Sequence, residues 1–246
     1  MVGPEFSAEV LRSEPDQRRR LTAEGRRALR RAARTSARSG ELSPLPYNLT
    51  ISHGHRFVWF RVAKVATRTL LGYFEEHEVL LDVEHAYRIR YPTALLADYF
   101  KFAFVRHPLP RFVSTWQDKV VNNNYFRFDA GTLGRMREHP LPFAAWVADL
   151  DLGDLAHADA HLVLQSCVVD LSQVDFLGRL ETFDEDFREV CSRIGLPAVP
   201  ATPRNQTASQ RPPALLDSTE LQDAVAQLYR RDYQILGYDP AGPRAL

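Results

Sequence analysis

One stretch of the chain, from Phe57 to Phe74, constrains the fold more than any other. It opens with the almost unbroken apolar run Phe57–Val62, which is typical of a strand buried inside a parallel sheet. It closes with apolar residues at helical spacing, which are Leu70, Leu71, Tyr73 and Phe74. The stretch therefore predicts a buried strand, a short turn and a helix with one apolar face.

The turn inside this stretch carries the polar and cationic residues Lys64, Thr67, Arg68 and Thr69. The first N–H groups of a helix are unpaired and its N-terminus is partially positive, so hydroxyls and a lysine complete a site for an anion. The turn lacks the glycines of the Walker A pattern G-x-x-x-x-G-K-[ST], and its lysine opens the turn instead of closing it. We therefore expect a phosphate-like group here, but not ATP bound as in the usual P-loop.

Size and composition favour one soluble globular domain. The 246 residues suffice for one substantial core, and 45% hydrophobic and 25% charged residues are ordinary values. The formal net charge is zero, so nothing draws the whole chain to nucleic acid. No apolar run approaches the roughly 18 residues of a membrane helix, and the N-terminus lacks the apolar core of a signal peptide. The two cysteines, Cys167 and Cys191, form no metal or redox spacing, which fits a reducing cytoplasm.

Residues 1–45 differ from the rest because they carry ten arginines. One interpretation is a basic arm for an anionic polymer. The other, which we favour, is a solvated helix that docks on the domain through its few apolar residues. The first six residues, MVGPEF, look like vector-derived sequence and are left out of fold arguments. The main domain is then expected over residues 46–246.

Strand and helix patterns alternate along the rest of the chain. Strands are expected at 79–83, 99–105 and 174–180, and helices at 111–121, 142–150, 184–194 and from Asp217 to Gly237. Residues 122–141 and 197–214 are expected to be loops and to carry substrate specificity. The alternation predicts an α/β fold whose sheet is covered by helices on both faces.

A second strand-to-helix junction follows the predicted strand at 99–105. Arg106 stands at the end of this strand, and Ser114 lies in the next helix. Ligands of open parallel sheets bind at the carboxyl ends of the strands, so both junctions are expected to face one crevice. Arg106 offers a forked, permanently charged contact and Ser114 offers a hydroxyl. Two anion sites at one crevice predict a ligand with phosphates at both ends.

The two junctions and three later stretches occur in an order that matches a known family. The turn reads A-K-V-A-T-R-T from Ala63 to Thr69, and the second junction reads V-R-H-P-L-P-R-F-V-S from Val105 to Ser114. Both resemble motifs of the PAPS-dependent sulfotransferases, P-K-x-A-x-T-[SN] for the 5′-phosphosulfate and V-R-[DH]-P-x-x-R-x-x-S for the 3′-phosphate. The chain looks like their carbohydrate sulfotransferase group, which includes the HNK-1 and chondroitin 4-O enzymes.

The later stretches extend this resemblance over most of the chain after residue 55. They are 159–165, similar to a D-x-H-W-x-P-Q motif, then 176–182 and 228–233. The chain departs from the family pattern at Ala63, which replaces a proline, at Arg68, and at Leu162 and Leu164, which replace Trp and Pro. These departures affect the acceptor and the loop geometry more than the donor. The membrane anchor of the Golgi enzymes is not found, so a soluble, cytoplasmic, bacterial form is expected.

The resemblance implies a P-loop-like three-layer sandwich with a mostly parallel central sheet, and PAPS as the sulfuryl donor without a metal. Lys64 is then expected to neutralise the bridging oxygen of the donor. The loop N–H groups are expected to hold the 5′-phosphosulfate together with nearby side chains, over the residues Val65, Ala66, Thr67, Arg68 and Thr69. Arg106 and Ser114 are expected to bind the 3′-phosphate, and Arg111 to brace the motif from behind. The acceptor is expected to be a hydroxyl of a carbohydrate, a glycolipid or another small molecule.

The acceptor hydroxyl needs a general base, and histidine suits this role near neutral pH. His161 is the first candidate because of its motif, and His85 is the second because it lies between the two cofactor strands in the sequence. An ordinary structural role for His161 is the alternative. A metal site of His157, Asp159 and His161 is also conceivable on a helix, but it lacks an identified third strong ligand.

Two other functions stay open at this point. A nucleotide kinase of P-loop-like architecture is disfavoured by the missing Walker A glycines and by the lack of evident Mg²⁺ carboxylates. A non-catalytic protein that binds polyanions through residues 1–45 is the other alternative. The sequence does not indicate an oligomeric state.

Overall fold

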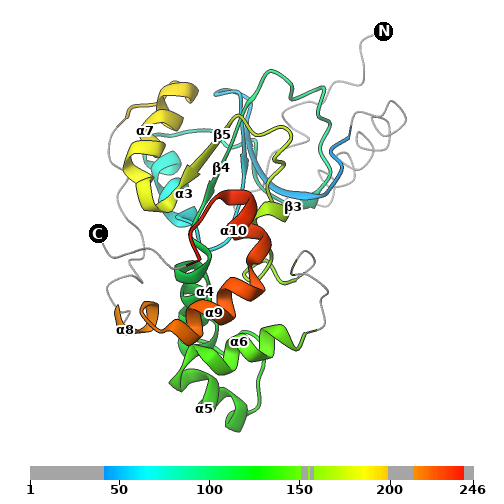
Figure 1. The fold of residues 1–246 in the computed structure, drawn as a ribbon. Coiled ribbons are helices and arrows are strands. Elements are labelled where there is room, and N and C mark those ends of the chain that lie inside the picture. Colours follow the sequence, from blue (N-terminus) through cyan, green and yellow to red (C-terminus); the bar gives the residue numbers. More distant parts are fainter. Residues whose placement is uncertain (1–41, 151–154, 156–157, 199–212, 241–246) are drawn as a thin grey trace. The chain divides into compact units, whose positions relative to one another are not determined.

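The computed structural model describes residues 42–150, 155, 158–198 and 213–240. These residues form two compact units that alternate along the chain (Figure 1). The first unit holds the described residues of 1–62, 67–104 and 168–202, and the second holds those of 63–66, 105–167 and 203–246. Most of the predicted basic arm and of the loop predicted at 197–214 lie outside the described residues.

The first unit is built on a mixed sheet. Its five described strands are β1 (Tyr47–Ser52), β2 (Phe57–Phe60), β3 (Val83–Ile89), β4 (Phe100–Val105) and β5 (Phe176–Arg179). Their order is β3-β1-β2-β4-β5. β1 runs antiparallel to both β2 and β3, whereas β2 and β4 are parallel, with Phe57 opposite Phe100. The α/β class is confirmed, but the sheet is only partly parallel.

The antiparallel part arises from a hairpin that the sequence analysis missed. β2 is buried at all four positions and pairs with a strand on each side, with β4 in parallel and with β1 antiparallel. The polar residues Thr50 and Ser52 hid the strand pattern of β1, yet both are buried. Their hydroxyls donate to the carbonyl oxygens of Glu84 and Leu80, each at 2.7 Å. The strand expected at 79–83 is therefore wrong, and β3 begins at Val83.

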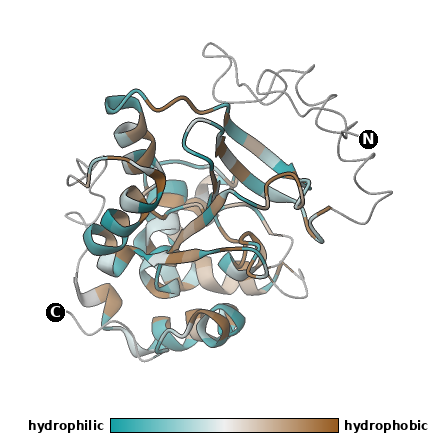
Figure 2. Ribbon diagram, turned by 90° about the horizontal axis from the view of Figure 1, so that it is seen from above, coloured by the Kyte–Doolittle hydropathy of each residue, from teal (hydrophilic) through white to brown (hydrophobic). Residues whose placement is uncertain are grey.

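Two helices cover this sheet with aromatic contacts. Phe74 of α3 (Thr67–Glu76) stacks on Phe57 of β2 with ring centroids 5.3 Å apart. α7 (Phe183–Ile194) packs Phe187 near Phe104 of β4, and the turn η4 (Leu180–Thr182) precedes it. The helix expected at 184–194 is confirmed, and Gly195 ends it in the left-handed conformation with φ of 70°. Brown and teal alternate along the helices in Figure 2, as expected for elements with one apolar face.

The second unit is mainly helical. Its described helices are α4 (Pro108–Trp116), the π-helix η1 (Gln117–Val121), α5 (Ala130–Glu138), α6 (Pro140–Ala148), η3 (Gln165–Cys167), α8 (Pro213–Leu216), α9 (Thr219–Leu228) and α10 (Arg230–Leu236). Phe112 of α4 stacks on Phe143 of α6 at 5.3 Å and contacts Tyr229, which joins three parts of the chain. None of the helices in the described part is long and apolar enough to cross a membrane.

Two expectations for this unit are wrong. Residues 122–141 are not one loop, because α5 and the start of α6 lie there. Asp129 and His139 begin these helices by accepting hydrogen bonds from the next turn, a local signal that Gly131 and Gly134 obscured. The final helix is also split at Tyr229, and Ser218 caps α9 in place of Asp217.

Candidate functional site

The turn Ala63–Ala66 between β2 and α3 has an unusual backbone. Lys64 and Ala66 have φ angles of 69° and 44°, in the left-handed region that residues other than glycine rarely adopt. Between them, the side chain of Val65 is buried at 1% exposure. Such conformations persist only where the surroundings impose them, and they concentrate at functional sites. The turn is therefore held in place by its neighbours in the second unit.

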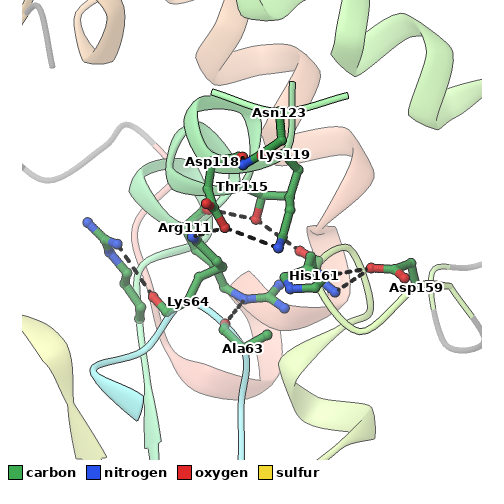
Figure 3. A network of polar contacts seen from close by, with 10 residues as sticks. Ala63, Lys64, Arg111, Thr115, Asp118, Lys119, Asn123, Asp159 and His161 are labelled. Carbon is green, nitrogen blue, oxygen red and sulfur yellow. Dashed lines mark hydrogen bonds and ion pairs between the residues drawn. The ribbon is translucent and has the colours of Figure 1, made fainter. Parts of the chain in front are cut away.

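Two arginines of the second motif supply this support. Arg111 donates from Nε to the carbonyl oxygen of Ala63 at 3.2 Å, and Nη1 of Arg106 lies 3.5 Å from the carbonyl oxygen of Lys64. The guanidinium of Arg111 is only 1% exposed, and its Nη2 is buried without a partner among the described residues. The first and second motifs thus meet at the backbone of the turn, where Figure 3 shows Arg111 beside Ala63.

Gln165 fixes the other side of Arg106. Its side-chain Oε1 accepts from the Arg106 N–H at 2.9 Å, and its Nε2 donates to the Arg106 carbonyl oxygen at 2.8 Å. The carboxylate of Asp232 in turn accepts from the backbone N–H groups of Gln165 and Ser166. One amide side chain thus satisfies both backbone polar groups of Arg106 and helps to fix this residue at the end of β4. Ser114, one helical turn beyond Arg111, is buried at 3% exposure.

Lys64 points toward an aspartate of the π-helix η1 (Figure 3). Its Nζ lies 3.0 Å from Oδ2 of Asp118, and Nζ of Lys119 lies 3.3 Å from the same oxygen. Burial by itself raises the pKa of Asp118, but the hydrogen bond and charge of Lys64, together with those of Lys119, outweigh it. The pKa of this carboxyl is therefore lowered, and Asp118 is a carboxylate at neutral pH.

His161 forms a close pair with Asp159 in the same unit. Nδ1 of His161 lies 2.8 Å from Oδ1 of Asp159, whose Oδ2 accepts from the Tyr125 hydroxyl at 3.0 Å. Burial raises the pKa of Asp159, but its hydrogen bonds from His161 and Tyr125 prevail and lower the pKa to about 2. A carboxylate facing Nδ1 requires a proton there, so Nε2 is the ring nitrogen left to accept one in the neutral form. The carbonyl oxygen of His161 also accepts from Thr115 of α4 at 3.0 Å.

The comparisons with known proteins match most of the chain. The model of the sulfotransferase family covers residues 47–239. The chain belongs to the sulfotransferase family. It is also similar to carbohydrate sulfotransferase 14 of Danio rerio, with 24% identity over 203 residues. That match covers 68% of this chain and 54% of the relative, so the chain spans about half the length of the curated relative. No solved structure matches the chain.

The family membership confirms the resemblance inferred from the motifs, and it supports a transferase that moves sulfuryl groups. The second unit of this chain contains six of the expected site residues, which are Lys64, Val65, Ala66, Arg106, Ser114 and His161. The others belong to the first unit. Thr67, Arg68 and Thr69 begin α3, where Thr67 donates to the carbonyl oxygen of Val62 at 3.3 Å, and half-buried His85 lies on the edge strand β3.

Sequence reasoning missed several residues of this chain that contact Lys64, or the Asp159 partner of His161. Asp118 and Lys119 were assigned only to a helix and Tyr125 to a loop, although Asp118 follows Ser114 by four residues. The π-helix changes the side-chain register there, and no local pattern announces it. Among the described residues no group of three or more His, Cys, Asp or Glu could hold a metal ion. His157, a member of the alternative metal site, lies outside the described residues.

Proposed function

We propose that the chain transfers the sulfuryl group of PAPS to a hydroxyl of a carbohydrate or related acceptor and releases PAP. Family membership supports sulfuryl transfer, and the name of the Danio rerio relative supports a carbohydrate acceptor. The parallel pair β2–β4 and the strand-turn-helix run from β2 into α3 support a P-loop-like layering of the fold. The observation that carries the proposal is the contact of Arg106 and Arg111 with the backbone of the Lys64 turn.

The residues at this turn suit a ligand with two anionic ends. Lys64 and Arg106 bring two cationic side chains to one turn, since Nη1 of Arg106 lies 3.5 Å from the carbonyl oxygen of Lys64. The buried Nη2 of Arg111 is a donor without a partner in the described part of the chain. The N–H groups at the start of α3, with Thr67 and Thr69, would hold the 5′-phosphosulfate. Arg106 and Ser114 would hold the 3′-phosphate. PAPS, when bound, supplies an activated sulfuryl group on a phosphate leaving group.

The transfer is one displacement at sulfur. The acceptor oxygen forms a bond to sulfur while the bond from sulfur to the bridging oxygen breaks, and that electron pair stays on the 5′-phosphate of PAP. Lys64 stabilises the negative charge that develops on this oxygen, which is the usual role of a preorganised cation at a leaving group. Nε2 of His161 accepts the proton of the acceptor hydroxyl. The products are a sulfate ester, PAP and a protonated histidine.

His161 is the better of the two candidate bases on structural grounds. Asp159 holds Nδ1 at 2.8 Å, orients the ring and stabilises the imidazolium that forms. His161 also belongs to the same unit as Lys64, and Thr115 of the motif helix α4 binds its carbonyl oxygen. His85 lies in the other unit, where the centre of its ring is 6.1 Å from that of Tyr87. We therefore assign the base to His161 and keep His85 as the alternative to test.

Titration calorimetry with PAP tests this function directly, with adenosine 5′-monophosphate and ATP as controls. We expect micromolar binding of PAP and a clear loss of affinity without the 3′-phosphate. An absence of preference for PAP would contradict the proposal, and stronger binding of ATP would favour a kinase. Turnover of PAPS with a panel of oligosaccharides then tests the acceptor class.

A further inference from the structure

The carboxylate of Asp118 is shared by two lysines. Nζ of Lys64 and Nζ of Lys119 lie 3.0 Å and 3.3 Å from the same oxygen, Oδ2. The three side chains are partly buried, with exposures of 14% for Lys64, 18% for Lys119 and 27% for Asp118. Two ammonium groups that converge on one oxygen form a binding position for an anion, and this position is filled by a side chain of the protein itself.

The surrounding groups make this position suited to an incoming anion. The cluster of two lysines and one carboxylate has a net charge of +1, and Arg106 and Arg111 add two positive charges at the adjacent turn. Asp118 lies on a π-helix of only five residues. Such elements are rare in proteins overall, but many of those known lie at functional sites. Because the ion pairs are partly exposed, their net contribution to stability is small and an anionic ligand can compete with the carboxylate.

Lys119 also connects this position with the candidate base. Its Nζ lies 4.7 Å from the centre of the Tyr125 ring, and the Tyr125 hydroxyl donates to Asp159, the partner of His161. An unbroken chain of contacts therefore runs from Lys64 through Asp118, Lys119 and Tyr125 to the Asp159–His161 pair, all within the second unit. In a displacement at sulfur, the transferring sulfonate must lie between the leaving oxygen and the base. Lys119 thus contacts Asp118, the partner of Lys64, and Tyr125, which donates to the partner of His161.

We propose that the carboxylate of Asp118 occupies the place of the donor's sulfonate in the resting protein, and that Lys119 is a second lysine that binds this sulfonate. When the donor binds, its sulfonate displaces Asp118 from Lys64 and Lys119, and both lysines then face the group to be transferred. Asp118 is a positioning residue that keeps the two ammonium groups together until then. This inference rests on the proposed function and adds two residues that the motifs do not contain.

The two substitutions Asp118→Asn and Lys119→Met separate this proposal from a merely structural role. Asparagine keeps the shape of the side chain but removes the competing charge, so the donor no longer displaces a carboxylate. Methionine keeps the length of the lysine stem but removes its ammonium. Glu189→Gln is the matched control, because Glu189 forms an ion pair with Arg193 at 2.8 Å on the surface of α7. Calorimetry without acceptor measures the affinity of each full-length variant for PAPS and for PAP.

We expect Asp118→Asn to bind PAPS about fivefold more tightly than wild type, as the loss of a partly exposed ion pair of about 1 kcal/mol allows. Lys119→Met is expected to weaken PAPS by a similar factor and to leave PAP, which lacks the sulfonate, nearly unchanged. The control should alter neither affinity. A structural role for Asp118 predicts the opposite sign, since a disordered site binds its ligand less well.

The possible outcomes distinguish a failure of this inference from a failure of the proposed sulfuryl transfer. Wild type that binds neither PAP nor PAPS overturns both. If the wild type binds both ligands but Asp118→Asn binds PAPS no more tightly than the wild type does, only the role of Asp118 is overturned. Equal weakening of PAP and PAPS by Lys119→Met overturns the role of Lys119. If Asp118→Asn does not fold, the Lys119→Met comparison still decides whether a second lysine binds the sulfonate.

Discussion

Arg111 donates a hydrogen bond from Nε to the carbonyl oxygen of Ala63, and this bond joins two motifs that are 48 residues apart in the chain. It explains how a turn without glycine holds Lys64 at a φ angle of 69°. A buried guanidinium fixes the peptide before Lys64, so the backbone cannot relax to a more common conformation. Arg111 thus acts on Lys64 through the backbone of the turn.

Replacing Arg111 with Met should destabilise the protein and weaken binding of PAP. The half-buried carbonyl oxygen of Ala63 then loses its partner, and a lost hydrogen bond of this kind costs about 0.5–1.5 kcal/mol. Urea denaturation measures the loss, and calorimetry measures the change in affinity. Arg193→Met is the control, since Arg193 is 61% exposed and forms its ion pair with Glu189 in the same helix. Unchanged stability of Arg111→Met would contradict the bracing role.

Substitutions of Lys64 and Arg106 should have different effects, the first mainly on turnover and the second mainly on binding. Lys64→Ala is expected to lower the turnover rate about a hundredfold or more while PAP still binds, because its charge is needed most at the leaving oxygen. Arg106→Ala should mainly weaken PAP and PAPS, with a smaller change in turnover at saturation. Steady-state kinetics combined with calorimetry gives both numbers. Equal and small effects of the two substitutions would remove the assigned roles.

His161 should be the base and Asp159 its orienting partner. His161→Ala is expected to reduce turnover about a hundredfold or more, within the usual range for a general base. Asp159→Asn should reduce turnover substantially but leave the affinity for PAP unchanged, because an amide no longer favours the tautomer with the proton on Nδ1. His85→Ala is the comparison variant. A loss of turnover in His85→Ala alone would transfer the role to His85.

The sequence predicted the parts of the fold that local patterns encode. The apolar run at Phe57 gave β2, and Gly195 marked the end of α7 in the left-handed conformation. β1 was not predicted, because its buried hydroxyls at Thr50 and Ser52 donate hydrogen bonds to the backbone of distant residues. Whether a polar residue in a strand is buried or exposed depends on these long-range partners, which no short window contains. The mixed character of the sheet follows from that strand.

The candidate site shows the same division. Lys64 and Arg106 were found at the two strand-to-helix junctions and His161 through a family motif, and the roles assigned to them stay predictions. Asp118, Lys119 and Tyr125 belong to no motif, and their importance arises only where η1 and the following turn bring them to Lys64 and Asp159. Tertiary contacts of this kind are set by the register of a π-helix, which composition and periodicity do not reveal.

Gly178 in β5 should not tolerate alanine. A Cβ atom at this position would lie 2.5 Å from Cε1 of Phe104, whose ring packs against Phe183 and Phe187 and has little room to move. Gly178→Ala is expected to cost about 1–3 kcal/mol through overpacking. Gly134→Ala is the matched control, because nothing lies within 4 Å of its Cβ and the change favours helix α5. Chemical denaturation of both variants checks the prediction, which fails if they change stability in the same direction.

The Asp159–His161 pair should make stability depend on acid pH in a defined direction. The pKa of Asp159 is lowered from 3.8 to about 2 in the folded protein, so the folded state favours the carboxylate over the acid. A lowered pKa adds stability that is fully present above the ordinary value and is lost as the pH falls through the folded value. Wild type should therefore exceed Asp159→Asn in stability most at pH 5 and above, with the gap closing as the pH falls toward 2. Urea denaturation of both proteins across this range measures the difference in their free energies of unfolding. A difference that stays constant down to the lowest pH would show that His161 and Tyr125 do not stabilise the carboxylate.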